Sequence, residues 1–480
     1  MRLNRVGEQN LFRQFGLFSF IPFLTFTISL YAQSFEDFKK TQINEYYVFM
    51  NKNDEKFDSY LKKQFMEYKA YKPIKLYKEE KPKSIFPLKP RVIEGVGPKI
   101  FVEVQHPKKS LLPKIETGKR GINFNYFGTK LGFNTPVNLK NIMFYPRNQK
   151  GISNFFEGVV SDDYSDLIKN IKYIKNSLNL NDWGVYQLVI KISNRVFSDS
   201  DRRKLLRWIL FDKLGYDAKV GISDRHIILM FYSKKLIYAT PNYTINNKKY
   251  YVLANYAGEK TGNVYTYDKN YPKAIKAFDL SLNTLPKFAK NEKSKTLHFR
   301  DYGRNYTIPF RYNQNLIDFM STYPQADYAT FFNAPMQNET YEDIASKLKS
   351  YMDGKHASSA INFLLHFVQK AFGYERDSMQ FSREKVMFAE ETLYYDKSDC
   401  EDRAVLFAYL VKKLLNIVVV GVKYKNHMTT ALFIPMRGDS IKTHGRRVVI
   451  ADPTYMNANV GEIMPKYKSI KPEKFILVNQ

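Results

Sequence analysis

The chain contains one cysteine among its 480 residues, Cys400. An intramolecular disulfide is therefore excluded, and a lipid-anchored N-terminus is excluded because no cysteine lies there. The sequence also lacks a glycine-rich loop that would cradle phosphate, a His-x-x-x-His zinc pair and a calcium loop with regularly spaced acids. No cofactor and no metal are implied.

Acidic residues are also scarce, with 47 Asp and Glu against 75 Lys and Arg, which gives a net charge of +28. This balance favours anionic partners such as nucleic acid, lipid headgroups or acidic envelope polymers. The alternative is a lysine-rich solvated surface that reflects a biased genomic composition. Hydrophobic residues make up 44% and aromatic residues 16%, which indicates a folded chain with room for two or three domains.

The N-terminus carries an apolar run over residues 17–30, which is too short for a comfortable transmembrane helix. Arg2, Arg5 and Arg13 precede this run, and Leu30-Tyr31-Ala32 offers a small-residue cleavage site. Residues 1–32 therefore read as a secretory signal peptide, with an uncleaved anchor as the alternative. We expect an exported protein of the periplasm or cell envelope that is not an integral membrane protein after cleavage. Nucleic acid is not expected as a partner, because that compartment lacks it.

Three further segments differ in composition. Residues 33–71 predict amphipathic helix, which is either a partner-binding arm or a helix packed on its own domain. Residues 72–120 are rich in Lys and Pro and predict a basic linker that could bind an anionic envelope polymer. Residues 246–340 alternate aromatic and polar side chains and predict a small β-rich connecting region.

Cys400 lies at the predicted start of a helix. Ser398 and Asp399 are good N-cap residues, and apolar residues follow at helical spacing from Val405 to Leu415. The partial positive charge at a helix N-terminus favours the nucleophilic thiolate. We therefore expect a thiol whose pKa lies below the usual value of about 8.5.

Three predicted strands follow the helix, over residues 417–424, 429–434 and 446–451. His427 stands at the entrance to the second strand and Asp452 follows the third. The two residues are symmetric about a turn between Asp439 and Ser440, so a hairpin would make them neighbours. A thiol beside a His that an Asp orients suits nucleophilic attack on acyl groups. Taken singly, a lone Cys, a lone His and an Asp-Pro-Thr turn are each more often structural.

The sequence Asp399-Cys400-Glu401-Asp402-Arg403-Ala404, a His before an apolar strand and a strand ending in Asp-Pro-Thr resemble the transglutaminase-like superfamily of cysteine enzymes. The resemblance covers residues 341–480. It implies a papain-like α+β domain with Cys400 as nucleophile, His427 as general base and acid, and Asp452 as the orienting carboxylate. Met428-Thr429-Thr430 departs from the family, whose members often carry an aromatic residue after the His. The backbone N–H of Cys400 is the default oxyanion donor, and Gln380 is a second candidate.

An upstream segment repeats this pattern. Ser198 to Asp201 would cap a helix, a strand follows, and His226 precedes an apolar strand. Leu214 and His226 match Leu415 and His427 at an offset of 201, and Gly221 matches Gly421 at 200. Residues 121–245 are therefore predicted to form a degenerate copy, with an accidental match of common elements as the alternative. In it Asp199 or Ser200 takes the place of the thiol, and Thr240 replaces Asp452 or that position is lost.

Two functions remain open. The first is an exported cysteine hydrolase or transamidase that acts on peptide or amide bonds of envelope substrates, with hydrolysis favoured. The second is a non-catalytic envelope scaffold in which both copies bind partners.

Overall fold

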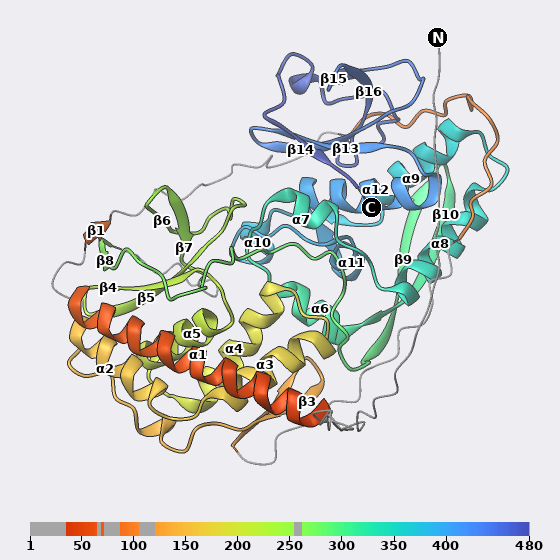
Figure 1. The fold of residues 1–480 in the computed structure, drawn as a ribbon. Helices are drawn as coiled ribbons and strands as arrows, with labels where there is room; N and C mark the ends of the chain where they lie inside the picture. Colours follow the sequence, from red (N-terminus) through yellow and green to blue (C-terminus); the bar gives the residue numbers. More distant parts are fainter. Residues whose placement is uncertain (1–34, 65–68, 72–86, 105–120, 254–261, 480) are drawn as a thin grey trace, which may run out of the picture. The chain divides into compact units, whose positions relative to one another are not determined.

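The computed structural model describes residues 35–64, 69–71, 87–104, 121–253 and 262–479. The predicted signal peptide lies outside these residues, as does much of the predicted linker. Over the described residues the chain has twelve α-helices and several antiparallel sheets, which confirms the α+β class (Figure 1). No helix in this part of the chain is both long enough and apolar enough to span a bilayer.

The chain divides into two compact units, Met1–Lys52 and Asn53–Gln480. Helix α1 (Phe35–Gln64) contributes its first residues to the smaller unit. From Asn53 onward α1 packs within the larger unit, where Phe57 and Leu61 are buried. The Phe57 ring lies 5.3 Å from that of Tyr271. Residues 69–71, predicted as helix, instead form strand β1 (Lys69–Tyr71), because they pair with a strand far along the chain.

The first half of the larger unit contains a helical layer and a sheet. It has a hairpin, four helices and a six-stranded sheet. The strands of the sheet lie in the order β1-β8-β4-β5-β7-β6. The elements are β2 (Ile122–Tyr126), β3 (Thr129–Phe133), α2 (Gln149–Val160), α3 (Ser165–Ser177), α4 (Asp182–Val196), α5 (Ser200–Lys213), β4 (Ala218–Ser223), β5 (His226–Tyr232), β6 (Asn242–Ile245), β7 (Lys248–Tyr251) and β8 (Val264–Thr266).

A hairpin of β9 (Glu292–Asp301) and β10 (Arg304–Asn313) joins the halves. Tyr302 and Gly303 turn it with positive φ angles of 45° and 80°, as a two-residue hairpin loop requires. The chain then becomes helical at α6 (Gln314–Ser321) and α7 (Tyr328–Phe332). Residues 246–340 therefore contain the β9–β10 hairpin, strands β7 and β8 of the upstream sheet, and helices α6 and α7.

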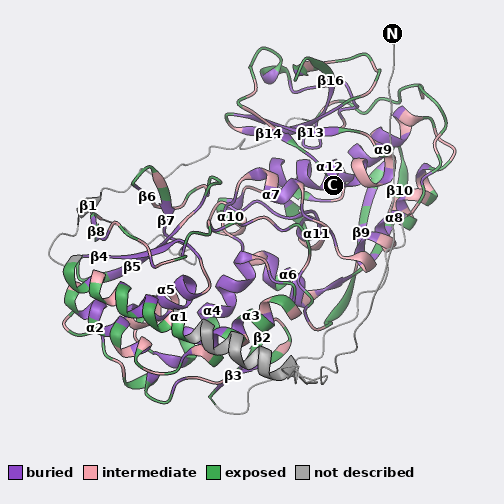
Figure 2. Ribbon diagram, in the orientation of Figure 1, coloured by how far each residue is buried: buried purple, intermediate pink, exposed green. Residues whose placement is uncertain are grey.

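The second half places helices against a five-stranded antiparallel sheet of order β15-β16-β14-β13-β17. The last helix, α12, contacts β13 and β14 and is buried along almost its whole length (Figure 2). The elements are α8 (Asn338–Met352), α9 (Ala357–Lys370), β11 (Gly373–Tyr374), α10 (Asp377–Gln380), α11 (Ala389–Tyr394), β12 (Lys397–Ser398), α12 (Cys400–Leu415), β13 (Val419–Tyr424), β14 (His427–Leu432), β15 (Ser440–Thr443), β16 (Arg446–Ala451) and β17 (Lys474–Leu477).

The two halves share one arrangement of helix and strands. Helix α5 contacts β4 and β5 as α12 contacts β13 and β14. Ser223 pairs with His226, and Tyr424 pairs with His427, so the two central hairpins correspond at an offset of 201. In both sheets the next strand along the chain is an edge strand, the one after it pairs with the second hairpin strand, and the last pairs with the first. Gly221 and Gly421 are one position out of this register, so they do not correspond.

The described part of the predicted linker runs along the second half. Gly97 has a φ of +92°, and a Cβ on Gly95 would lie 2.7 Å from Oγ of Ser359. These glycines let the segment approach the start of α9, where Val96 N donates to Oγ of Ser358 at 2.7 Å. The segment therefore has fixed backbone contacts in a region where composition predicts only a spacer.

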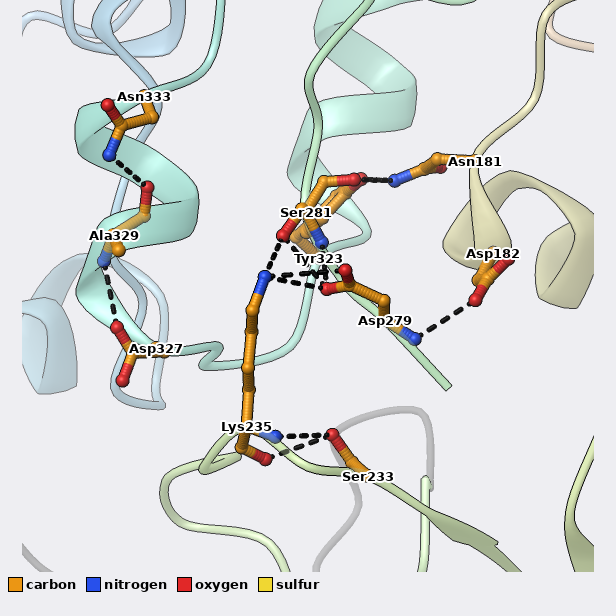
Figure 3. A network of polar contacts seen from close by, with 10 residues as sticks. All are labelled: Asn181, Asp182, Ser233, Lys235, Asp279, Ser281, Tyr323, Asp327, Ala329 and Asn333. Carbon is orange, nitrogen blue, oxygen red and sulfur yellow. Dashed lines mark hydrogen bonds and ion pairs between the residues drawn. The ribbon is translucent and has the colours of Figure 1, made fainter. Parts of the chain in front are cut away.

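A polar network ties the segment around residue 281 to α4 and to the β5–β6 connection (Figure 3). Nζ of Lys235 lies 3.1 Å from Oδ1 of Asp279 and also contacts Ser281. The Asp279 N–H donates to Oδ2 of Asp182 at 3.0 Å, and Nδ2 of Asn181 donates to the Ser281 carbonyl at 2.9 Å. These partners lie at the N-terminus of α4 and in segments outside the strands, so strand pairing does not account for this contact.

Glu390 provides a test of the buried structure. Burial raises its pKa to about 7 from the ordinary 4.5, against the opposing hydrogen bonds from Gln337 N and Thr340 Oγ1. Between these pH values the folded chain keeps a proton that the unfolded chain has lost, so the free energy of unfolding falls as pH rises. Glu390→Gln should remove roughly 3 kcal/mol of that fall. Urea unfolding of the wild type and of Glu390→Gln at about pH 5 and about pH 8 measures this change in the free energy of unfolding.

Glu55→Gln is the matched control, because Glu55 is exposed on α1. It should leave the pH dependence of the unfolding free energy unchanged. Equal slopes for the wild type and Glu390→Gln would contradict the assignment of a buried protonated carboxyl.

Candidate active site

Cys400 is the first residue of α12 and is 1% exposed. Asp399 and Asp402 form a capping box across the start of the helix, and Asp399 N donates to Oδ2 of Asp402 at 3.1 Å. Oδ1 of Asp402 accepts from Met387 N at 2.7 Å, which anchors the preceding loop to the same helix end. The predicted position of Cys400 at a helix N-terminus is where the structure places it.

The strand register differs from the symmetric hairpin predicted from the sequence. Strand β15 and a tight turn at His444 and Gly445 lie between β14 and β16, so the turn at Asp439 and Ser440 is not the hairpin centre. In the observed register Thr430 is opposite Ala451. This moves Asp452 by two positions relative to His427. An even shift keeps both side chains on one face of the sheet, at the diagonal distance where long side chains still meet.

His427 and Asp452 are joined by a buried hydrogen bond. Nε2 of His427 lies 3.0 Å from Oδ2 of Asp452, and the two side chains are completely buried. Oδ1 of Asp452 accepts from the N–H groups of Thr454 at 3.0 Å and Tyr455 at 3.2 Å, so both carboxylate oxygens are fixed. A carboxylate on Nε2 favours the tautomer with the proton there, which leaves the lone pair on Nδ1. Nδ1 of His427 has no hydrogen-bond partner among the described residues.

The two residues that follow Met428 act on the strand that carries Asp452. Oγ1 of Thr429 and Oγ1 of Thr430 donate to the carbonyl of Ala451 at 3.2 and 2.5 Å. Thr429 and Thr430, where the sequence departs from the transglutaminase-like pattern, therefore hold β14 to the end of β16.

Tyr467 packs on the imidazole of the His–Asp pair. Its ring stacks on the His427 imidazole, with centroids 4.8 Å apart and planes 18° apart. Its hydroxyl donates to Oδ1 of Asn426 at 2.9 Å. Burial raises the pKa of Tyr467, and the negative charges of Cys400 and Asp452 raise it further. Sequence reasoning missed Tyr467, because it lies beyond the last motif on a short turn.

Carboxylates surround the thiol. Sγ of Cys400 lies 3.2 Å from Oε2 of Glu401, a contact that stabilises the protonated thiol and so opposes the helix terminus. Ligand atoms of Asp399, Cys400 and Glu401 lie within 4.8 Å of one another, as do two sets that include Asp377. Such oxygen donors suit a hard cation. However, Asp402 is engaged by two backbone N–H groups, and Oδ2 of Asp377 accepts from Lys385 N at 2.8 Å. Capping and loop anchoring therefore account for Asp402 and Asp377.

Of the two predicted oxyanion donors, the Cys400 N–H lies at the start of α12 and Gln380 ends α10. The Cys400 N–H belongs to the first four of the helix, which have no acceptor within it. Nε2 of Gln380 is 3.4 Å from the carbonyl of Lys397, three residues before Cys400.

Sequence reasoning also missed the burial of Gln369 and Arg403. For Gln369 a signal exists, because this polar residue interrupts the apolar stripe of α9. Both side chains are fully buried.

The upstream copy presents different chemistry at the corresponding place. Asp199 is the N-cap of α5, so Ser200 occupies the position of Cys400. Ser200 is exposed, and Nδ1 of His226, a residue whose side chain is 70% exposed, lies 3.4 Å from Oδ2 of Asp201. Arg147 spans Asp199 and Asp201 at 3.1 and 3.0 Å. The helix end is therefore occupied by an ion pair.

Thr240 does not take the place of Asp452. It precedes edge strand β6, whereas the strand that pairs with β5 is β7. By the offset of 201 and the register of β5 with β7, the counterpart of Asp452 follows Leu253 and lies outside the described residues.

Two cavities differ in their relation to the thiol. One of about 570 Å³ is lined by Tyr455 and Pro465, which lie within the loop from Asp452 to Tyr467, and by Leu88 and Arg91 of the described linker. The other, of about 490 Å³, includes Lys235 and Lys413. Lys413 is thirteen residues after Cys400 on α12, or about 20 Å along the helix. The second cavity is therefore not the reaction site.

The reactivity of Cys400 tests the site directly. Iodoacetamide should alkylate it at pH values well below about 8.5, because the helix terminus and a neighbouring imidazolium favour thiolate. His427→Ala should lower the rate at neutral pH by about tenfold or more, since the imidazolium is lost. The rate is measured against pH by mass spectrometry of the native chain.

His226→Ala is the matched control, because His226 occupies the corresponding position beside no thiol. It should leave the alkylation rate unchanged. A wild-type profile that rises only near the ordinary thiol value would contradict the assignment of Cys400 as nucleophile.

Comparisons with known proteins return no relative of this chain. No protein-family model, no curated protein and no solved structure matches it. The interpretation of the site therefore depends on its own residues and geometry.

Proposed function

We propose that this chain is an exported cysteine hydrolase or transamidase of the transglutaminase-like type, with Cys400, His427 and Asp452 as its catalytic triad. The observation that carries the proposal is the buried hydrogen bond from His427 to Asp452, together with the position of Cys400 at the N-terminus of α12, the helix that packs on the strand of His427. A His–Asp pair that only stabilised the sheet would not need a thiol at the N-terminus of the helix that packs on the same strand.

The geometry supports a two-step acyl transfer. Nδ1 of His427 takes the thiol proton, and the Cys400 thiolate attacks the carbonyl carbon of a peptide or amide bond. Asp452 stabilises the imidazolium, which then returns the proton to the departing amine as the C–N bond breaks. The Cys400 N–H is placed to stabilise the oxyanion. A thioester remains, and either water or an acceptor amine attacks its carbonyl to release the thiolate.

Hydrolysis is the favoured outcome, because water reaches a thioester unless a site excludes it. The substrate proposed is a peptide or protein of the cell envelope, which follows from the signal-like residues 1–32. The excess of 28 positive charges supports a second contact with an anionic envelope polymer through the basic residues 72–120.

A scaffold without catalysis is the second candidate, and burial of the site favours it. Cys400 and His427 are each 1% exposed, so a substrate reaches them only after covering groups move. The upstream half also repeats the arrangement of helix and strands with Ser200 in place of a thiol. On this reading both halves provide binding surfaces.

Labelling separates the two candidates. The purified chain and its Cys400→Ser variant are treated with a panel of envelope-derived peptides that carry acyl electrophiles, followed by peptide-amide turnover assays. Labelling and turnover that disappear in Cys400→Ser support the enzyme. Retained partner binding in Cys400→Ser, without labelling or turnover of any panel member by the wild type, supports the scaffold and overturns the proposal.

Asp452→Asn should reduce turnover by on the order of 10⁴ while the fold persists. The amide is nearly isosteric, and its oxygen can still accept from Thr454 and Tyr455, but it cannot stabilise the imidazolium. Turnover and thermal unfolding are measured together. A folded variant with near-normal turnover would remove Asp452 from the triad.

A further inference from the structure

A guanidinium is buried next to the nucleophile. Arg403 lies one turn into α12 and is fully buried. Its Nε donates to Oγ of Ser398 at 3.0 Å, its Nη1 to the carbonyl of Gln369 at 3.2 Å and its Nη2 to the carbonyl of Phe372 at 2.8 Å. All three acceptors are neutral. The two carbonyls lie at the C-terminal end of α9 and just beyond it, where a cation is favourable.

None of these three hydrogen-bond acceptors of the guanidinium is a carboxylate. Burial lowers the pKa of Arg403 to about 10, while Tyr374, Asp399, Asp402 and Cys400 raise it. The side chain is therefore charged at neutral pH. Because interactions between titrating groups are mutual, a guanidinium stabilised by the thiolate of Cys400 also stabilises that thiolate. It opposes the effect of Glu401 at the same helix end.

The amide of Gln369 acts on the other part of the triad. Its Nε2 donates to the carbonyls of Asp452 and Ala458, each at 3.0 Å. Its Oε1 accepts from Asn457 N at 3.0 Å. Three hydrogen bonds from one buried side chain therefore fix the loop that follows β16.

Gln369 connects the two parts of the site. Its side chain holds the backbone of Asp452, and its own carbonyl receives the guanidinium of Arg403. Arg403 in turn is three residues from Cys400 on one helix turn. A continuous set of direct hydrogen bonds therefore runs from the His427–Asp452 pair to the nucleophile helix, through two buried side chains.

We propose that Gln369 and Arg403 are positioning residues of the triad, which set the thiol against the His–Asp pair, and that the charge of Arg403 maintains the thiolate. This inference rests on the proposed function. Burial of an arginine whose hydrogen-bond acceptors are neutral costs several kcal/mol, and an apolar side chain would fill the same space more cheaply. Stabilisation of the Cys400 thiolate gives the charge of Arg403 a role that packing alone does not.

The test uses alkylation of Cys400 by iodoacetamide against pH in the full chain, with thermal unfolding measured in parallel. Arg403→Met removes the charge at similar size and should raise the midpoint of the alkylation profile by about one pH unit. Gln369→Met removes the three amide hydrogen bonds and should lower the rate at neutral pH about tenfold, because His427 loses its oriented partner.

Two further variants separate positioning from stability. Arg403→Lys keeps the charge but not the planar fork, so it should keep the midpoint while lowering the rate at neutral pH. Gln187→Met replaces a buried glutamine on α4, 7% exposed, that is remote in sequence from the triad. It should lower thermal stability and leave the alkylation profile unchanged.

His427→Ala distinguishes failure of this inference from failure of the proposed function. If His427→Ala leaves the profile unchanged, the triad itself is wrong. If it changes the profile while folded Arg403→Met and Gln369→Met retain wild-type profiles, only the positioning inference is overturned. Should Arg403→Met fail to fold, Arg403→Lys decides: a wild-type rate and midpoint together overturn the inference.

Discussion

The hydrogen bond from Nε2 of His427 to Oδ2 of Asp452 is the constraint around which the second half is arranged. It needs two strands in one register, a loop whose N–H groups hold the remaining carboxylate oxygen, and exclusion of water from both side chains. Thr429 and Thr430 help to hold the strands, and Gln369 holds the loop. The bond also sets the tautomer that leaves Nδ1 as the proton acceptor.

The environment of the thiol balances opposing charges. The terminus of α12 and the guanidinium of Arg403 favour a thiolate, whereas the Glu401 carboxylate and burial favour a thiol. The balance between thiol and thiolate is sensitive to small movements of these charged groups. Charges a few ångströms apart interact strongly where there is little water. Cys400 is buried and Tyr467 stacks on His427, so a reagent reaches the thiol only after the groups around it move.

The two halves show how one arrangement of helix and strands supports different sites. Strand order and hairpin register correspond, yet the helix end is occupied in one half by Cys400 and in the other by the pairs of Arg147 with Asp199 and Asp201. The fold therefore supplies the position, a helix N-terminus against a central hairpin, and individual side chains decide what is done there.

Local signals in the sequence were enough to predict the elements that carry Cys400, His427 and Asp452. Capping residues and apolar periodicity placed Cys400 at a helix start, and strand 446–451 was predicted at the bounds observed. The register was not predictable by symmetry, because β15 intervenes and pairing is decided by contacts across the sheet. The Gly221–Gly421 match failed for the same reason, since a shift of one residue reverses the face. Gln369, Arg403 and Tyr467 come from segments separated by tens of residues, and only tertiary packing, which buries them together, gives them their partners.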